Sequence, residues 1–135
     1  MSMHLRIVTP EAKIYDDQVD DVLLPGVEGE MGILPNHSAL MTQIKPGELR
    51  IKKGGEIIPL AVGEGFVEIT GDTISVLTDL AVKESDIDEQ KTQEAVHRAE
   101  EALRAKTLVG EELEATQAAL ARSLAQLHVK RRRHG

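Results

Sequence analysis

Two polar side chains stand out because of the segment in which they lie. Glu30 and His37 belong to residues 26–42, where three glycines and one proline interrupt apolar residues. Glycine and proline at this density favour an exposed loop, which we expect to lead into a strand. A carboxylate and an imidazole displayed on such a loop can form ion pairs and hydrogen bonds with a partner surface. The simpler alternative is a plain surface turn.

The other chemistry-bearing residues form no recognisable catalytic pattern. The sequence lacks the Gly-x-Ser-x-Gly, His-Glu-x-x-His and phosphate-loop motifs, and it contains no cysteine. Its 5 histidines are scattered, with no second ligand at metal-binding spacing. The acid pairs Asp16-Asp17 and Asp20-Asp21 lack the alternating acids and turn glycine of a calcium loop, and we expect Asp20-Asp21 to face solvent. We therefore predict no catalytic residue and no metal site.

Composition excludes several kinds of binding protein. The 135 residues carry 16 Lys+Arg and 23 Asp+Glu, a net charge of -7, which argues against a nucleic-acid partner because each phosphate contact needs a cation. Tyr15 and Phe66 are the only aromatic residues, too few for a base-stacking platform. No apolar run approaches the ~20 residues of a membrane span, and the N-terminus does not resemble a signal peptide. We expect an intracellular protein without direct membrane insertion.

Glycine, proline and alanine divide the chain into two parts. All 5 prolines precede residue 60, whereas alanine is concentrated after residue 84. Residues 1–84 hold 7 basic and 14 acidic side chains, whereas residues 85–135 are neutral and end in a basic run, Lys130 to Arg133. Turn formers favour short strands, and alanine favours helices. We predict an α+β chain with two domains, residues 1–84 and 85–135.

Residues 1–84 predict an antiparallel β-sandwich of roughly eight to ten short strands. Gly71-Asp72 separates two apolar runs and predicts a two-residue hairpin turn with glycine first. Pro59 cannot donate a ladder hydrogen bond, so we expect it at a sheet edge or a bulge.

Residues 85–135 predict two antiparallel helices. Ser85 is the expected N-cap of the first helix, with an acid three residues later, and Gly110 is the expected break between the helices. Leucines 113, 120, 124 and 127 share one stripe of the second helix, with alanines beside them. Alanine buries little apolar area, so this hairpin should be held weakly and could change partners at low cost. A hairpin that never moves is the alternative.

The segment Gly29-Glu30-Met31-Gly32-Ile33-Leu34-Pro35-Asn36-His37 resembles the signature of the epsilon subunit of F-type ATP synthases. The resemblance continues through Ile44-Lys45-Pro46-Gly47, Asp79-Leu80-Ala81, Asp86-Ile87-Asp88 and Leu124-Ala125-Gln126-Leu127, so it covers essentially the whole chain in order. It implies a non-catalytic rotor subunit whose sandwich grips the gamma subunit and rests on the ring of c subunits. Glu30 and His37 are then the ring contacts.

The resemblance also implies that the hairpin either folds against the sandwich or extends along gamma into the catalytic head, where it obstructs ATP hydrolysis. Acidic surface on the beta subunits of the alpha/beta head would meet its cations. The cations available for this contact are Arg98, Arg104, Arg122, Lys130, Arg131, Arg132 and Arg133.

Bacterial members of the family can bind ATP at the hairpin, which makes Asp88, Lys91, Arg98 and Arg122 the candidate nucleotide site. Lys91 stands where the family pattern has arginine, and Gln126 stands where stronger binders have a second arginine. Lysine does not reproduce the bidentate fork of arginine. We predict ATP binding that is millimolar at best and no other cofactor.

Two hypotheses of different classes follow. The first is a regulatory subunit that couples proton translocation to ATP synthesis, bound peripherally at the cytoplasmic face of the plasma membrane or at a thylakoid membrane. The second is a free-standing ligand-binding sandwich with a dimerisation hairpin, which the scarcity of aromatic residues disfavours. Capture of gamma, rather than self-association, would distinguish them.

Overall fold

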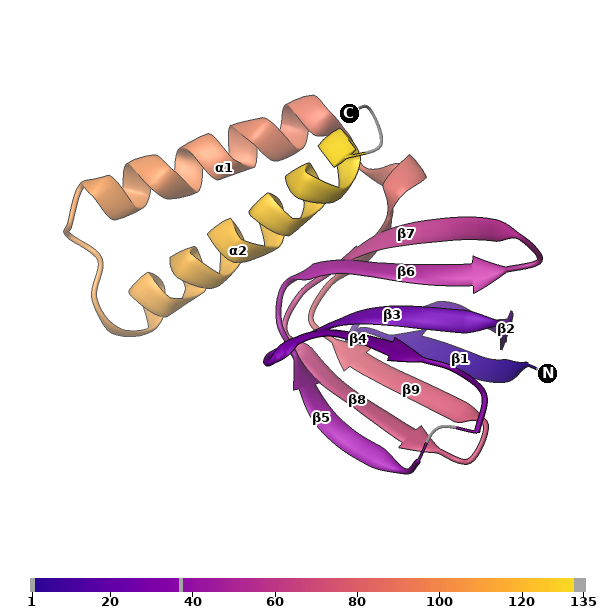
Figure 1. Cartoon of the computed structure of the whole chain (residues 1–135). Coiled ribbons are helices and arrows are strands. Elements are labelled where there is room, and N and C mark those ends of the chain that lie inside the picture. The colour runs from indigo at the N-terminus through magenta and orange to yellow at the C-terminus, as the bar shows by residue number, and fades with distance from the viewer. Residues whose placement is uncertain (1, 37, 133–135) are drawn as a thin grey trace.

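The computed structural model describes residues 2–36 and 38–132 and shows a two-layered β-sandwich followed by two antiparallel helices (Figure 1). The predicted α+β class, with the strands first and the helical hairpin second, is confirmed. The strands are β1 (Met3–Val8), β2 (Lys13–Val19), β3 (Asp21–Gly26), β4 (Gly29–Ile33), β5 (Leu40–Ile44), β6 (Gly47–Lys53), β7 (Glu56–Val62), β8 (Gly65–Thr70), β9 (Thr73–Thr78) and β10 (Ala81–Lys83). A 3₁₀ turn, η1 (Glu84–Asp86), precedes α1 (Glu89–Arg104) and α2 (Gly110–Arg132).

The strands follow the order β10-β7-β6-β3-β5-β8-β9-β1-β2, with β4 paired to β3. One pair, Gly26 with Ile44, joins β3 to β5 where the sheet passes from one layer to the other. The pairings in the described part of the chain are antiparallel except that of β1 with β9, which is parallel. The predicted hairpin at Gly71-Asp72 is confirmed, since Thr70 pairs with Thr73 and Gly71 has a φ of 60°.

Alternation along the strands places every second side chain in the core. In β1, the side chains of Met3, Leu5 and Ile7 are buried while their neighbours are not. Isoleucine, leucine, valine and methionine from both layers fill the interior. Pro59 lies in β7 just beyond the end of β10, where that side of β7 is a sheet edge, as expected for a residue without an N–H.

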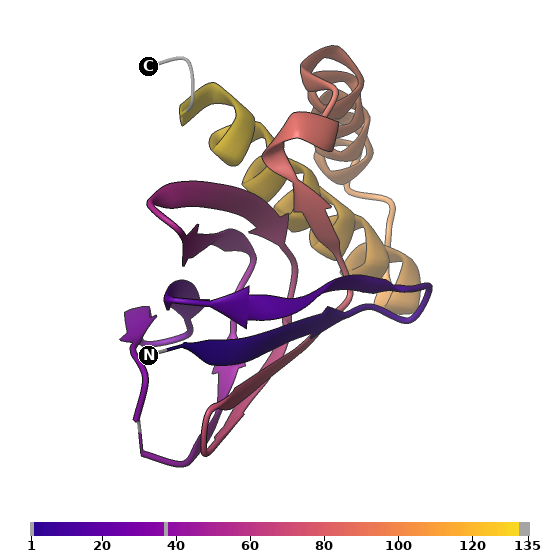
Figure 2. The same cartoon turned by 90° about the vertical axis from the view of Figure 1, so that its right-hand side faces the viewer.

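The helical hairpin lies at one end of the sandwich (Figure 2). Helix α2 contacts β6 and β7, and α1 packs on α2 farther from the strands (Figure 1). The predicted start at Ser85 is wrong, because Ser85 belongs to η1 and α1 begins after Asp88, whose side chain accepts a hydrogen bond from the Lys91 N–H at 3.0 Å. The N-cap therefore lies three residues later than predicted, at the acid that the Ser85 pattern placed inside the helix.

Candidate functional site

The contact between the hairpin and the sandwich contains little apolar surface. Ala61 of β7, Ile87 and Val129 of α2 form a small buried cluster, with Val82 packed against it. Of the predicted leucine stripe, Leu127 is buried but Leu124 is 45% exposed. Burying a few alanine- and valine-sized groups stabilises an interface by only a few kcal/mol, at ~25 cal/mol per Å².

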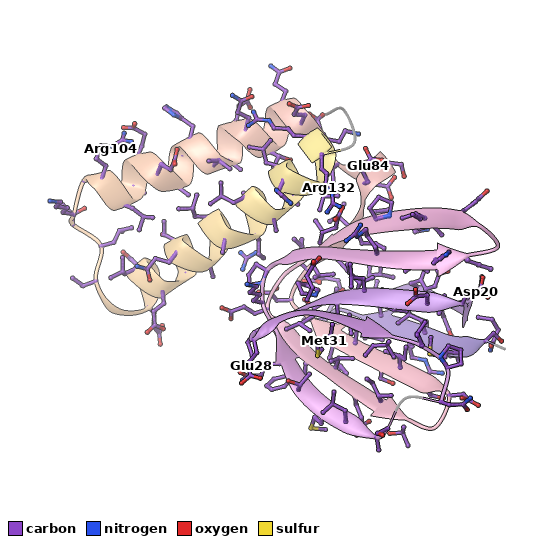
Figure 3. All side chains as sticks on the ribbon, viewed as in Figure 1. Asp20, Glu28, Met31, Glu84, Arg104 and Arg132 are labelled. Atoms are coloured by element: carbon purple, nitrogen blue, oxygen red, sulfur yellow. The ribbon has the colours of Figure 1, made fainter. Side chains whose placement is uncertain are left out.

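Charged side chains complete this contact. Within residues 2–36 and 38–132, three ion pairs connect α2 to the sandwich or to η1, and we name these three pairs the docking clasp. They join Arg132 to Glu48, Lys130 Nζ to Glu84 Oε1 at 3.4 Å, and Arg122 Nη1 to Asp79 Oδ2 at 3.3 Å. Figure 3 shows Glu84 and Arg132 together where the last turn of α2 meets the strands. Lys130 also donates to the Glu84 carbonyl at 3.3 Å.

Gly63 makes room for one of these pairs. A Cβ at this buried position would overlap Asp79 Oδ1 and would lie 3.4 Å from Arg122 Cγ. The absent side chain therefore lets the Asp79 carboxylate reach the Arg122 guanidinium. Sequence reasoning did not identify Gly63, because a glycine between two strands resembles any other turn former.

Glu30 lies in β4, so the prediction of a loop at this point is wrong. Residues 29–33 pair with β3 through a tight hairpin, in which Gly26 pairs with Gly29. The Glu30 side chain is 64% exposed, and its Oε2 lies 3.5 Å from Arg50 Nη2. This exposure leaves the carboxylate accessible to a partner. His37, the other predicted ring contact, lies outside the described residues.

A cleft of about 520 Å³ opens between β4, β6 and α2. Glu30, Glu48 and Arg132 line it together with Lys45 and His128, and Leu124 and Pro25 supply apolar wall. The cleft thus places the predicted ring contact Glu30 beside the end of the hairpin, which the sequence alone did not indicate.

The predicted inhibitory cations differ in the partners that they have in the docked hairpin. Arg122, Lys130 and Arg132 are held in the docking clasp. Arg131 pairs with Glu89 of α1 at 3.2 Å, and Arg104 pairs with Glu101, so both remain within the hairpin. Arg98 is exposed and has no ion pair in the described part of the chain. Arg133 lies outside the described residues.

The four predicted nucleotide-binding residues do not contact one another through their side chains. Asp88 caps α1, Arg122 pairs with Asp79 of the sandwich, and Lys91 and Arg98 are exposed. Across residues 2–36 and 38–132, no hydrogen bond or ion pair joins any two of these four side chains. A phosphate of ATP would therefore compete with Asp79 for the Arg122 guanidinium.

The acidic pairs near β2 have local partners. Asp16 pairs with Lys13, and Asp17 pairs with Lys53; these hydrogen bonds lower the pKa of each carboxyl below its ordinary value. Asp20 Oδ2 accepts a hydrogen bond from the Gly54 N–H at 2.9 Å. No group of three metal-ligating side chains occurs among the described residues.

The outer face of the β5-β8-β9 layer carries exposed apolar side chains. Met41 is 66% exposed, Phe66 52% and Leu77 56%, and Phe66 lies directly opposite Leu77 across β8 and β9. We name these three residues the apolar face. The strand alternation places them opposite the core, and this period-two pattern was the signal available in the sequence. Exposed apolar residues gathered on one face typically mark a contact with another chain.

Comparison with known proteins assigns the chain to a family. The profile described as ATP synthase, Delta/Epsilon chain, beta-sandwich domain matches residues 2–84, and the profile described as the long alpha-helix domain of that chain matches residues 85–131. The chain belongs to the ATP synthase delta/epsilon chain family. An ATP synthase epsilon chain of Dehalococcoides mccartyi is 42% identical over 134 residues, which is 98% of this chain and 96% of the relative. One of Gloeobacter violaceus is 40% identical over 127 residues, with 94% and 96% covered.

Solved structures share the fold of this epsilon-type chain. A chain in the cryo-EM structure of the Euglena gracilis mitochondrial ATP synthase matches with a TM-score of 0.72 at 23% identity, covering 89% of this chain and 76% of that one. A chain in the Tetrahymena thermophila central stalk and c-ring matches with a TM-score of 0.56 at 13% identity, covering 100% and 98%. The delta/epsilon family consists of non-catalytic subunits, so this chain is a subunit of an ATP synthase and not an enzyme by itself. In the described residues, neither helix combines the length and the apolar character needed to cross a membrane.

Proposed function

We propose that this chain is a rotor subunit of the central stalk, which couples proton translocation to ATP synthesis and inhibits ATP hydrolysis through its hairpin. Residues 1–84 are the gamma- and ring-binding domain of this proposal, and residues 85–135 are its regulatory domain. The observation that carries it is the character of the docked hairpin, which is held by the docking clasp and a small apolar cluster. Such a contact can open and close reversibly.

Two surfaces of the sandwich support the proposed partners. The apolar face offers Met41, Phe66 and Leu77 to the gamma subunit, and Glu30 offers an exposed carboxylate to the c-subunit ring. The subunit would then be peripheral, at the cytoplasmic face of the plasma membrane or at the corresponding face of a thylakoid. Replacing Glu30 and His37 together by alanine should weaken ATP-driven proton pumping by the assembled enzyme and leave the sandwich folded. Unchanged pumping would contradict the ring assignment.

The inhibition proposal rests on an exchange of partners. Arg122, Lys130 and Arg132 pair with the chain's own carboxylates when the hairpin is docked, and we propose that acidic surface on the alpha/beta head replaces those carboxylates when it extends. The shift from 1:99 to 99:1 needs about 5.5 kcal/mol of differential binding. Charged hydrogen bonds of ~1.5–3 kcal/mol each, if several form, are sufficient.

Deletion of residues 85–135 tests this proposal in the purified enzyme. We expect faster ATP hydrolysis with assembly and synthesis largely intact. The deletion also uncovers Ala61 and Val82, so a second variant leaves the sandwich covered. Arg98→Gln with Arg104→Gln removes two cations that form no ion pair with the sandwich in the described part of the chain. That variant should give part of the increase, more strongly at low salt. Hydrolysis at the intact enzyme's rate in both variants would overturn the inhibitory role.

Glu48→Gln should change the rate of ATP hydrolysis in the opposite direction from the deletion. It removes the carboxylate that holds Arg132 in the docked state but removes no cation from the hairpin, so extension becomes easier and hydrolysis should fall. Glu56→Gln is the matched control, since Glu56 is an exposed carboxylate of β7 with no ion pair in the described part of the chain. Equal hydrolysis in the two variants would show that docking does not limit inhibition.

A further inference from the structure

One carboxylate of β6 serves two arginines from different parts of the molecule. Glu48 Oε1 accepts a hydrogen bond from Arg132 Nη1 of α2, and the same oxygen lies 3.5 Å from Arg50 Nε of β6. The Glu48 side chain is only 7% exposed. A carboxylate this deeply buried depends on its cations, because water does not replace them.

Arg50 is shared in its turn. Its Nη2 lies 3.5 Å from Glu30 Oε2, while its buried Nε has no hydrogen-bond partner within the described residues. A separation of 3.5 Å is too long for a well-formed hydrogen bond. Arg50 is therefore held loosely between two carboxylates, and its unused Nε donor lies 3.5 Å from the carboxylate that Arg132 occupies.

These contacts form a continuous series of alternating charge. It runs from Glu30 on β4, through Arg50 and Glu48 on β6, to Arg132 at the end of α2. Side-chain exposure is 64% at Glu30, 29% at Arg50, 7% at Glu48 and 46% at Arg132, so Glu48 in the middle of the series is screened least by water. One end of the series is the predicted partner contact, and the other end, Arg132, belongs to the hairpin.

We propose that Glu30, Arg50, Glu48 and Arg132 form a charge relay that couples the occupancy of Glu30 to the docking of the hairpin. A cationic side chain of a partner that pairs with Glu30 frees Arg50 to pair fully with Glu48, and this weakens the hold of Glu48 on Arg132. The inference rests on the proposed function only for the identity of that partner, the c-subunit ring.

The sign of the coupling follows from the charges. Once Glu30 is neutralised, the positive charge of Arg50 is no longer balanced on its outer side. Arg50 then competes with Arg132 for Glu48 Oε1, and this competition favours undocking. The other two pairs of the docking clasp, Asp79–Arg122 and Glu84–Lys130, share no side chain with this series and so provide internal controls.

Hydrogen exchange of the α2 amides in the isolated full chain measures hairpin opening directly. Glu30→Gln should raise the opening constant by about two- to fivefold, the range for a partly exposed ion pair. Glu28→Gln is the matched control, because it removes the same charge two residues away and Glu28 has no ion pair in the part of the chain described. Equal exchange in the two variants would overturn the relay.

A double-mutant cycle then tests the route of the coupling. In a Glu48→Gln background, Glu30→Gln should have no further effect, because the inner carboxylate is absent. In an Asp79→Asn background, its two- to fivefold effect should persist and multiply with the effect of Asp79→Asn. Persistence of the Glu30→Gln effect in Glu48→Gln would overturn the relay. Because both measurements use the chain alone, they can succeed even if the assembled enzyme shows that Glu30 does not contact the ring.

Discussion

The interior of the sandwich and the contact between the hairpin and the sandwich differ in how much apolar surface they bury. The sandwich interior is a continuous cluster of branched aliphatic side chains, including Leu5, Leu24 and Ile51, each with no exposed surface. The hairpin contacts the sandwich through the small cluster of Ala61, Ile87 and Val129 and through the three ion pairs of the docking clasp. The first interface gains its free energy from apolar area, and the second combines little area with charges that can change partners. The hairpin can therefore separate from the sandwich more easily than the two layers of the sandwich can separate from each other.

Leu5→Ala in β1 should have the largest effect. Leu5 is fully buried between the layers, and truncation of such a leucine costs ~2–5 kcal/mol through lost burial and the cavity left behind. Urea unfolding followed by circular dichroism would report a lower midpoint for the sandwich transition. A change below about 1 kcal/mol would show that the sandwich is not the rigid partner in this comparison.

Val129→Ala in α2 is the matched truncation on the other side. Val129 is also fully buried, but it packs in the small cluster with Ala61 and Ile87. We expect faster hydrogen exchange in α2 with the urea midpoint of the sandwich nearly unchanged. Loss of the sandwich transition in this variant would mean that the two parts unfold as one unit, and the contrast would fail.

Gly63→Ala should weaken docking without removing a charge. The new methyl group would occupy the space of the Asp79 carboxylate, which must turn away from Arg122. An exposed ion pair is worth ~0.2–1 kcal/mol, so hairpin opening should rise by up to about fivefold in hydrogen exchange. Gly32→Ala is the control, because its nearest neighbour is a Leu23 methyl at 4.0 Å. Similar exchange in both variants would remove Gly63 from the docking contact.

Acid should produce a smaller change in the stability of the sandwich. The pKa values of Asp16 and Asp17 are lowered by hydrogen bonds from Lys13 and Lys53, respectively. A carboxyl with a lowered folded-state pKa contributes stability above its ordinary value of 3.8, and this contribution is lost as the pH falls through the lowered value. The sandwich should therefore weaken in urea below about pH 4, and Asp16→Asn with Asp17→Asn should flatten that decline. An unchanged pH profile in the variant would show that Asp16 and Asp17 do not cause the loss of stability in acid.

ATP should have the smallest effect, because Arg122 is held by Asp79 and Lys91 lacks the bidentate fork of arginine. Titration calorimetry on the full chain should detect no site tighter than about millimolar, and ATP should leave hairpin exchange unchanged. The variant Lys91→Arg with Gln126→Arg introduces arginine at both positions where this chain departs from the family pattern, and measurable ATP binding should then appear. A micromolar constant for the unaltered chain would contradict the prediction and would give the hairpin a second means of stabilisation.

The sequence predicted more of the fold than of the candidate site. Alternating apolar residues and the Gly71-Asp72 turn predicted the strands, and Gly110 marked the start of the second helix, because these signals are local. The start of α1 was misplaced because both Ser85 and Asp88 have side chains that can cap a helix, and only packing decides between them. Arg132 and Glu48 could not be paired from the sequence, since they lie 84 positions apart and meet only once α2 is docked.

The parallel pairing of β1 with β9 has a consequence for synthesis of the chain. Leu5 of β1 lies opposite Ile74 of β9. The first strand to leave the ribosome, β1, therefore cannot pair with β9 until nearly the whole sandwich has been translated. This high contact order makes closure of the sandwich slow relative to formation of a local hairpin. The strand pairings among the described residues nevertheless all lie before residue 84, so every strand of the sandwich emerges from the ribosome before α1 and α2 do. The nascent chain can thus form the sandwich first and add the helical hairpin last.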